Sequence, residues 1–290
     1  MPIARLLLTC LAALLLLVPA GQVSAEDGWY WLSSDDKYSK YGDLSSIVTQ
    51  ESVQTPKGKV PIIIDAWTKT SYSYEGAKET IAAYGLTAKI PNPANFAYSL
   101  AQVRVRPQTR TIQYLREEFY DQKNTLLWSK GVGREKEINS QQFDEEFYDA
   151  VVDHVFRMGE MKRRTAKDRW LTLWEDRTAE GQSTYVTADT TTMRMKGNNL
   201  ILWEWQETKD EYGNVLEIKF MKKAVNLPNS TERVINLQYW TSATGWQRQD
   251  EPGNDYRVPQ TGAAYNGINV LRQYVRKYPA WVNRYNLEGK

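Results

Sequence analysis

The chain runs through one order of sequence motifs twice, and this repeat restricts the possible folds more than any single motif. In the first half, a Trp-led segment (29–32) precedes a Tyr-x-Asp-x-Ser-Ser segment (41–47) and an apolar segment that ends in Trp-Thr-Lys (62–69). Segments of the same three types recur in the second half, at 170–174, 185–193 and 200–207. Self-similarity over a long period indicates a structural unit used more than once. We therefore expect two homologous domains, although one large mixed domain with coincidental patterns stays open.

A longer correspondence follows the apolar segments. Residues 101–114 and 223–239 each read as an alternating strand, a polar turn and a second alternating strand. The turns contain Pro107 and Pro228. Alternation on both sides of such a turn is typical of a β-hairpin.

Each half closes with an amphipathic helical pattern. Apolar residues recur at three- and four-residue steps at Phe143, Phe147, Val151, Val155 and Met158, and again at Ile268, Leu271, Val275 and Tyr278. Pro279 follows the second pattern and should end that helix. The predicted fold class is α+β: two tandem domains, each a mainly antiparallel β-sheet with a C-terminal helix packed on one face.

The two halves differ between their third and fourth strands. The first half inserts residues 74–84, a short predicted helix that Gly85 stops. At the same place the second half has a predicted hairpin turn at 209–214. The second half also carries a long polar stretch, 242–263, which we expect to be a loop.

The first 25 residues have the features of a secretory signal peptide. One positive charge, Arg5, precedes an apolar run at 6–18, and a small-x-small pattern predicts cleavage between Ala25 and Glu26. The alternative, a membrane anchor, needs about 20 apolar residues. We expect an exported protein, periplasmic, cell-surface or secreted. The predicted organisation is signal peptide 1–25, first domain 26–160, charged linker 161–168 and second domain 169–290.

Composition excludes several kinds of chemistry. The chain has one His and one Cys, and Cys10 lies in the predicted signal peptide. A Ser-His-Asp or Cys-His site would have to use that single His, and His- or Cys-rich metal cages cannot be assembled, so we expect no catalytic residue, no cofactor and no metal site. His154 is interpreted as a partly buried structural residue of the first helix. The 37 basic and 35 acidic side chains are nearly balanced, so we predict no nucleic-acid binding. No second apolar stretch approaches the length of a membrane span, so we predict none in the mature chain.

Adjacent acidic residues occur in pairs at 35–36, 117–118 and 250–251. Neighbours in a strand point to opposite faces, so such a pair cannot flank one glycosidic bond. We interpret all three pairs as surface charge, which leaves a carboxylate-only glycosidase as the least favoured function. The acidic loop 250–255 is a weak alternative for calcium.

Four aromatic residues are candidates for ligand binding. Trp203 and Trp205 are two apart in a predicted strand and so face the same side of the sheet. That side is either a stacking platform for sugars or the core face beneath the C-terminal helix, and we favour the core face. Tyr72 and Tyr74 lie beside the inserted helix and are expected to be more exposed.

The motifs of the first half resemble those of the surface-adhesin protein E family. The resemblance rests on Trp29, on Tyr41–Ile47, on Ile63–Lys69 and on a turn at Tyr120–Leu126, where Asn124 replaces the family's preferred Gly. It covers about residues 29–157, and 170–280 more weakly. It implies an exported, non-enzymatic domain with a six-stranded-type antiparallel sheet and a helix across it. Relatives often carry a Cys pair, which this chain lacks.

The expected function is therefore an exported bacterial binding or cell-envelope interaction protein, adhesin-like and non-enzymatic. The alternative is a carbohydrate-binding module that uses exposed Trp and Tyr side chains. The expected partner is a protein or a glycan outside the cytoplasm. The edge strands of the sheets also permit a homodimer.

Overall fold

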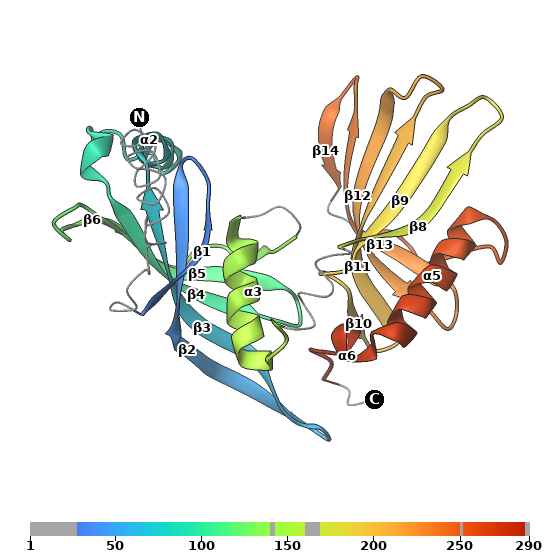
Figure 1. Ribbon diagram of the computed structural model, residues 1–290, viewed down its shortest axis with the longest axis horizontal. Helices are drawn as coiled ribbons and strands as arrows, with labels where there is room; N and C mark the ends of the chain where they lie inside the picture. Colours follow the sequence, from blue (N-terminus) through green and yellow to red (C-terminus); the bar gives the residue numbers. More distant parts are fainter. Residues whose placement is uncertain (1–27, 140–142, 160–168, 250–251, 288–290) are drawn as a thin grey trace, which may run out of the picture.

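A computed structural model describes residues 28–139, 143–159, 169–249 and 252–287, and in these residues each half of the chain forms one antiparallel sheet (Figure 1). The signal peptide, the linker 161–168 and the acidic pair 250–251 lie outside the described residues. Among those residues, no helix has the length and apolar character needed to cross a membrane.

The first sheet is a simple meander in the order β1-β2-β3-β4-β5-β6, with β7 beside β5. Its strands are β1 (Trp29–Ser34), β2 (Tyr38–Thr55), β3 (Gly58–Tyr72), β4 (Tyr98–Arg106), β5 (Thr111–Tyr120), β6 (Leu126–Lys130) and β7 (Lys136–Glu137). Its helical elements are α2 (Tyr74–Ala83), the 3₁₀ turn η2 (Pro93–Asn95) and α3 (Phe143–Phe156).

The second sheet has the order β14-β13-β12-β11-β9-β8, with β10 beside β11 and β15 beside β13. Its strands are β8 (Trp170–Arg177), β9 (Ser183–Asp189), β10 (Arg194–Lys196), β11 (Asn199–Lys209), β12 (Val215–Asn226), β13 (Thr231–Thr241), β14 (Gly245–Gln249) and β15 (Tyr256–Arg257). Two helices follow, α5 (Ala263–Lys277) and α6 (Pro279–Val282). Read from β8, this is the meander of the first sheet, with β9 and β10 together in the place of β2.

A side-chain motif at the irregular part of β2 occurs again after β9. Asp43 accepts hydrogen bonds from the amide and hydroxyl of Ser45, and the Ser46 hydroxyl donates to the Asp43 carbonyl. In the second half, Asp189 accepts the same two bonds from Thr191, and the Thr192 hydroxyl donates to the Asp189 carbonyl. The motif shared by the sequence segments 41–47 and 185–193 is thus a conformational element, which turns the chain at a break in strand pairing.

The central hairpins also match. In the turn between β4 and β5, Arg110 has a φ of 57°, and in the turn between β12 and β13 Ser230 has a φ of 53°. The carbonyl of Arg110 accepts from the amide of Ile138, and the carbonyl of Ser230 accepts from the amide of Val258. Each turn therefore fixes the segment that leads to the closing helix of its half.

Each half has its own apolar core. In the first half, Phe147, Val151 and Val152 of α3 pack with Ile64 and Val103 of the sheet. In the second half, α5 lies along the sheet (Figure 1), and its residues Ile268, Leu271 and Tyr274 share one core cluster with sheet residues that include Val186, Leu200 and Leu202. The prediction of two tandem units built on antiparallel sheets is confirmed, although the chain is mainly β, with four α-helices among the described residues.

Several local predictions are confirmed. The insertion forms α2, and Gly85 follows it with a φ of 67°. Asp210 closes a tight turn in which its backbone amide donates to the Asn214 carbonyl and its side chain accepts from the Asn214 amide. In the predicted turn at 120–126, Asn124 has a φ of 62°, a conformation that Asn tolerates better than most residues.

The sequence predicted a loop at 242–263, but this stretch is not a plain loop. It contains β14, which pairs with β13 and extends the sheet, and β15, which pairs with the start of β13. Polar residues predominate in β14 because it is an edge strand with a mainly exposed surface. The prediction failed because low hydrophobicity is typical of both loops and edge strands.

Candidate functional site

Trp203 and Trp205 lie on the face of the second sheet opposite α5, which no helix of the described residues covers. In β11, Leu200 and Leu202 point into the core beneath α5, so the alternating residues Trp203 and Trp205 point the other way. The favoured interpretation, that both tryptophans form the core beneath the C-terminal helix, is wrong. The period-two pattern shows that they share a face, but it does not show which face the helix covers.

The strand register places further aromatic residues on this face. Trp205 pairs with Phe220, Ile218 pairs with Trp240, and Trp240 pairs with Trp246 of β14. We call this side the open face; it comprises Trp203, Trp205, Ile218, Phe220, Trp240 and Trp246. Phe220 stacks on Trp203 with ring centroids 4.5 Å apart, and Trp246 lies 6.4 Å from Trp205.

The exposure of the aromatic side chains increases along the open face from Trp203 to Trp246. Trp203 is only 3% exposed, because the first half covers it, and its indole N–H donates to Glu137 at 3.3 Å. Trp205 is half-buried, and Trp246 is 53% exposed. The aromatic face thus begins under the first half and continues into solvent toward β14. Trp240 and Trp246 were missed as candidates, although a tight turn between two tryptophans is a readable signal of a cross-strand pair.

A cleft of about 620 Å³ lies where the open face meets the first half. The first half contributes Arg134, Glu135, Lys136, Glu137 and Asn139, and the second half contributes Trp203, Asn236, Gln238 and Arg248. Glu137 also accepts from the ammonium of Lys222 at 2.7 Å. The cleft therefore has an aromatic end at Trp203 and a charged wall from the segment that precedes α3.

Arginines join the two halves beside this cleft. The guanidinium of Arg194 donates to the carbonyls of Gln108 and Thr109 in the first half and to that of Thr192 in the second. Arg169 bonds to Glu145 on α3 and to Asp189, the last residue of β9. Each arginine belongs to the second half and bonds to a group of the first half, Arg194 to backbone carbonyls and Arg169 to a carboxylate of α3. These bonds therefore fix the position of one half relative to the other.

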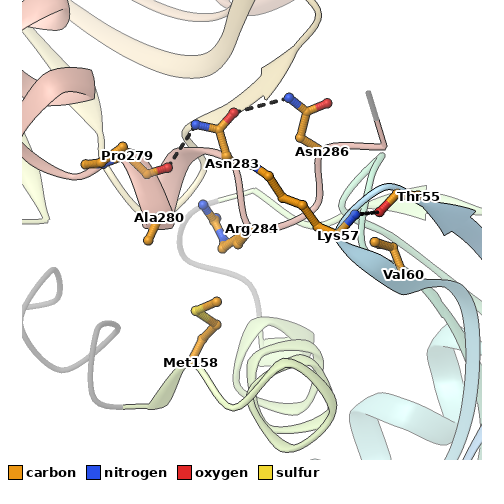
Figure 2. A pocket seen from close by; sticks show the side chains of 9 residues that line it. All are labelled: Thr55, Lys57, Val60, Met158, Pro279, Ala280, Asn283, Arg284 and Asn286. Atoms are coloured by element: carbon orange, nitrogen blue, oxygen red, sulfur yellow. Dashed lines mark hydrogen bonds between the residues drawn. The ribbon is translucent and has the colours of Figure 1, made fainter. Parts of the chain in front are cut away.

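Tyr285, which follows α6, also joins the halves. It belongs to the core cluster of the first half, where its ring lies 5.0 Å from that of Phe156. A cavity of about 410 Å³ adjoins this junction, and Figure 2 shows that its lining side chains come from the β2–β3 hairpin, from Met158 and from the C-terminal segment. Asn286 donates to Asn283, and Asn283 donates to the Pro279 carbonyl. These amides bond to one another, so they do not point to a ligand.

A second pocket lies in the first half, on the sheet face that carries α2 and α3. It has a volume of about 360 Å³, and its walls are Asp35, Tyr38, Lys40, Thr70, Tyr72, Thr80, Tyr84, Tyr114, Glu117 and Asp144. We call it the tyrosine pocket. Tyr72, a predicted candidate, is half-buried in it, and its hydroxyl is 2.8 Å from that of Ser99. Tyr74, the other candidate of this half, is 55% exposed at the start of α2 and does not line the pocket.

The charged groups of the tyrosine pocket are mostly paired. The ammonium of Lys40 bonds to Asp144, which also accepts from Lys136 and, at 2.7 Å, from the Tyr114 hydroxyl. Burial alone would raise the pKa of Asp144, but the charges of Lys40 and Lys136 outweigh it and hold that pKa well below its usual range. Asp144 is therefore an ionised carboxylate whose oxygens are occupied by its ion pairs.

Glu117 differs from Asp144. Burial raises its pKa, and the hydrogen bond from the Tyr84 hydroxyl, 2.7 Å long, only partly opposes that effect. Its neighbour Glu118 points to the other face and bonds to Arg116 and Tyr120. The interpretation of this pair as surface charge is wrong, because both side chains are buried. Sequence missed Glu117 because its partner comes from the α2 insertion, far away along the chain.

The structure does not assemble the other sites that the sequence analysis considered. His154 is exposed on α3 rather than partly buried. Asp35 accepts from the amides of Lys37 and Tyr38 in a turn. Within the described ranges, no group of three or more His, Cys, Asp or Glu side chains is placed to hold a metal ion.

No protein-family model matches this chain, and a comparison with curated proteins finds no match either. The geometry described above is thus the basis for assigning a function.

Proposed function

We propose that this is an exported, non-enzymatic binding protein of the bacterial cell envelope that captures its partner on the open face of the second sheet. One observation carries the proposal: an aromatic face without a covering helix, half-exposed at Trp205 and exposed at Trp246. Aromatic residues on an accessible surface are enriched at binding sites, where they supply most of the contact energy. The resemblance of the first half to an adhesin family agrees with a binding role.

The neighbouring cleft supports the same proposal. It extends the open face with charged and amide side chains from both halves, so a partner can meet apolar rings and polar groups together. The arginine contacts between the halves hold the two walls of the cleft in place. A surface that is fixed before binding costs less conformational entropy when the partner arrives.

Carbohydrate is the second candidate partner, and the indole geometry favours it. The rings of Trp205 and Trp246 meet at 57° rather than stacking, so part of each ring face is left for another group. Sugar rings bind to aromatic faces and hydrogen-bond to side chains such as Gln238 and Arg248 at the rim of the cleft. This hypothesis assigns to the open face the role that the sequence offered for Trp203 and Trp205.

The test is a glycan array together with a matrix-protein binding assay on residues 26–290. Trp205→Ala and Trp246→Ala should each weaken the binding found, by roughly tenfold or more if they are hot-spot residues. Tyr212→Ala is the matched control, since Tyr212 is an exposed aromatic residue of the same half in the β11–β12 turn. Binding that both tryptophan variants retain in full would contradict the proposal.

A further inference from the structure

The tyrosine pocket of the first half has the size and lining of a small-molecule site, separate from the open face. Its volume of about 360 Å³ lies within the ordinary range for ligand pockets. It sits between two helices on one sheet face: α2 supplies Thr80, the residue that caps the end of α2 is Tyr84, and α3 supplies Asp144. The second half has no counterpart of α2 among its described elements, so the pocket is specific to the first half.

Aromatic rings dominate its walls. Tyr38 and Tyr72 meet edge to face at 5.8 Å, and Tyr84 packs on Phe119 and Trp128. These contacts hold three of the four rings in place, and the pocket between them is open to solvent on one side. The negative face of an aromatic ring attracts a cation placed over it.

The charges of the lining are unequal. Three carboxylates and one ammonium line the pocket, and that ammonium, Lys40, is bonded to Asp144. Asp35 lies in an exposed turn and is engaged by backbone amides. Glu117 is therefore the one carboxylate of the lining that is both buried and outside any ion pair within 4.0 Å among the described residues.

Only one oxygen of Glu117 has a hydrogen-bond partner among these residues, the Tyr84 hydroxyl on Oε2. Glu117 is nonetheless buried, with only 8% of its surface exposed. Burial of a carboxylate without a full set of partners costs folding free energy, and its raised pKa expresses that cost. Groups that destabilise the fold in this way are concentrated at functional sites.

We propose that the tyrosine pocket binds the primary ammonium group of a ligand, with Glu117 Oε1 accepting its hydrogen bonds and the tyrosine rings enclosing its alkyl chain. An ammonium group supplies N–H donors to Oε1 together with a positive charge in direct contact, whereas Lys40 and Lys130 act on Glu117 only through their charges. The same group occurs in free alkyl diamines and in the lysine side chains of peptides, and the experiment separates these sources.

The test is titration of the full chain, by calorimetry and by NMR of the tyrosine ring signals. The probes are 1,5-diaminopentane, Nα-acetyl-L-lysine N-methylamide and the neutral methyl β-glucoside. We expect one or both amines to bind and the glucoside not to bind. Binding of the diamine alone identifies a free amine as the ligand class, and binding of the lysine amide identifies a peptide side chain.

Glu117→Gln should weaken amine binding by about tenfold or more, because it removes the charge while keeping the shape. Glu118→Gln is the matched control: it lies next along β5, is buried and points to the opposite face, so it should leave binding unchanged. Circular dichroism checks that each variant is folded.

Three results would overturn the proposal. They are no binding of either amine at roughly 10 mM, well above a Kd of about 1 mM, equal amine binding by Glu117→Gln and the wild type, and preferential binding of the glucoside. The last result would indicate a neutral polyol ligand instead. None of them bears on the open face, whose test uses the tryptophan variants.

Discussion

The backbone amide of Trp203 donates a hydrogen bond to the hydroxyl of Thr192, with 3.0 Å between nitrogen and oxygen. In the first half, the amide of Trp67 donates to the hydroxyl of Ser46 at 2.9 Å. In both halves, the last hydroxyl of the Asp-led motif thus satisfies the backbone of the following tryptophan strand. This shared bond is the closest local correspondence between the halves, and it supports a common origin for them.

Thr192→Val should destabilise the protein. Thr192 is fully buried, so valine keeps its shape but leaves the Trp203 amide without its hydroxyl acceptor. It also removes one of two hydrogen bonds to the Asp189 carbonyl, which keeps the bond from the backbone amide of residue 192. We expect a loss of about 1–3 kcal/mol in the free energy of unfolding, measured by urea denaturation. Thr172→Val on exposed β8 is the control and should change it by less than about 0.5 kcal/mol. Equal effects of the two changes would show that the motif is dispensable.

Asp144→Asn should lower the free energy of unfolding more than Thr192→Val does. It removes the negative charge of Asp144 from the ammonium of Lys40, which is 2% exposed. Breaking a buried pair in this way typically costs about 3–5 kcal/mol. Because the folded-state pKa of Asp144 lies below its ordinary value of 3.8, its ion pairs stabilise the fold above that pH and are lost as pH falls below it. Acid titration of stability should therefore be steeper for the wild type than for the variant.

Glu117→Gln should stabilise the protein at neutral pH. The groups that face its carboxylate are Tyr84 on α2, Lys130 on β6, Lys40 on β2 and Asp144 on α3. The folded-state pKa is raised, so the carboxyl favours folding only while protonated, and that contribution is lost as pH rises through the raised pKa. The gain from glutamine should be present at pH 7.5 and should shrink toward pH 4. Urea unfolding at both values measures it, and a variant less stable at pH 7.5 would contradict the burial argument.

Arg194→Met should weaken the junction of the two halves. It removes the donors for three carbonyl groups, those of Gln108, Thr109 and Thr192, from a site that is nearly closed to solvent. We expect calorimetry to show one unfolding transition for the wild type and two for the variant, as the halves lose their coupling. Arg276→Met, on the surface of α5, is the control. A single transition in the Arg194 variant would show that the other contacts suffice.

Much of the fold could be predicted because its signals are local. The hairpin turns at Pro107 and Pro228, the helix that Gly85 ends and the turn at Asp210 depend on residues a few positions apart. The repeat added the expectation that the strands follow the same order in both halves. The side of the sheet occupied by α5 is decided by long-range packing, and so the position of Trp203 and Trp205 was predicted wrongly.

The tyrosine pocket depends on contacts of the same long-range kind. Tyr84 meets Glu117 across 33 positions, and Lys40 meets Asp144 across 104. Alternation along β5 separates Glu117 from Glu118 correctly, but it does not show that a helix inserted elsewhere will cover one of them. A buried carboxylate on a strand looks like a surface residue until its partners are known.

The ring of Tyr285 completes a core whose other members lie between residues 32 and 156. During synthesis, this ring becomes available only after the described strands and helices of both halves have been made. The first half therefore reaches its final packing after the second half has emerged, and a chain cut before residue 285 leaves a gap in the half that was made first. Packing of the first half is thus complete only when the segment that follows α6 has joined it.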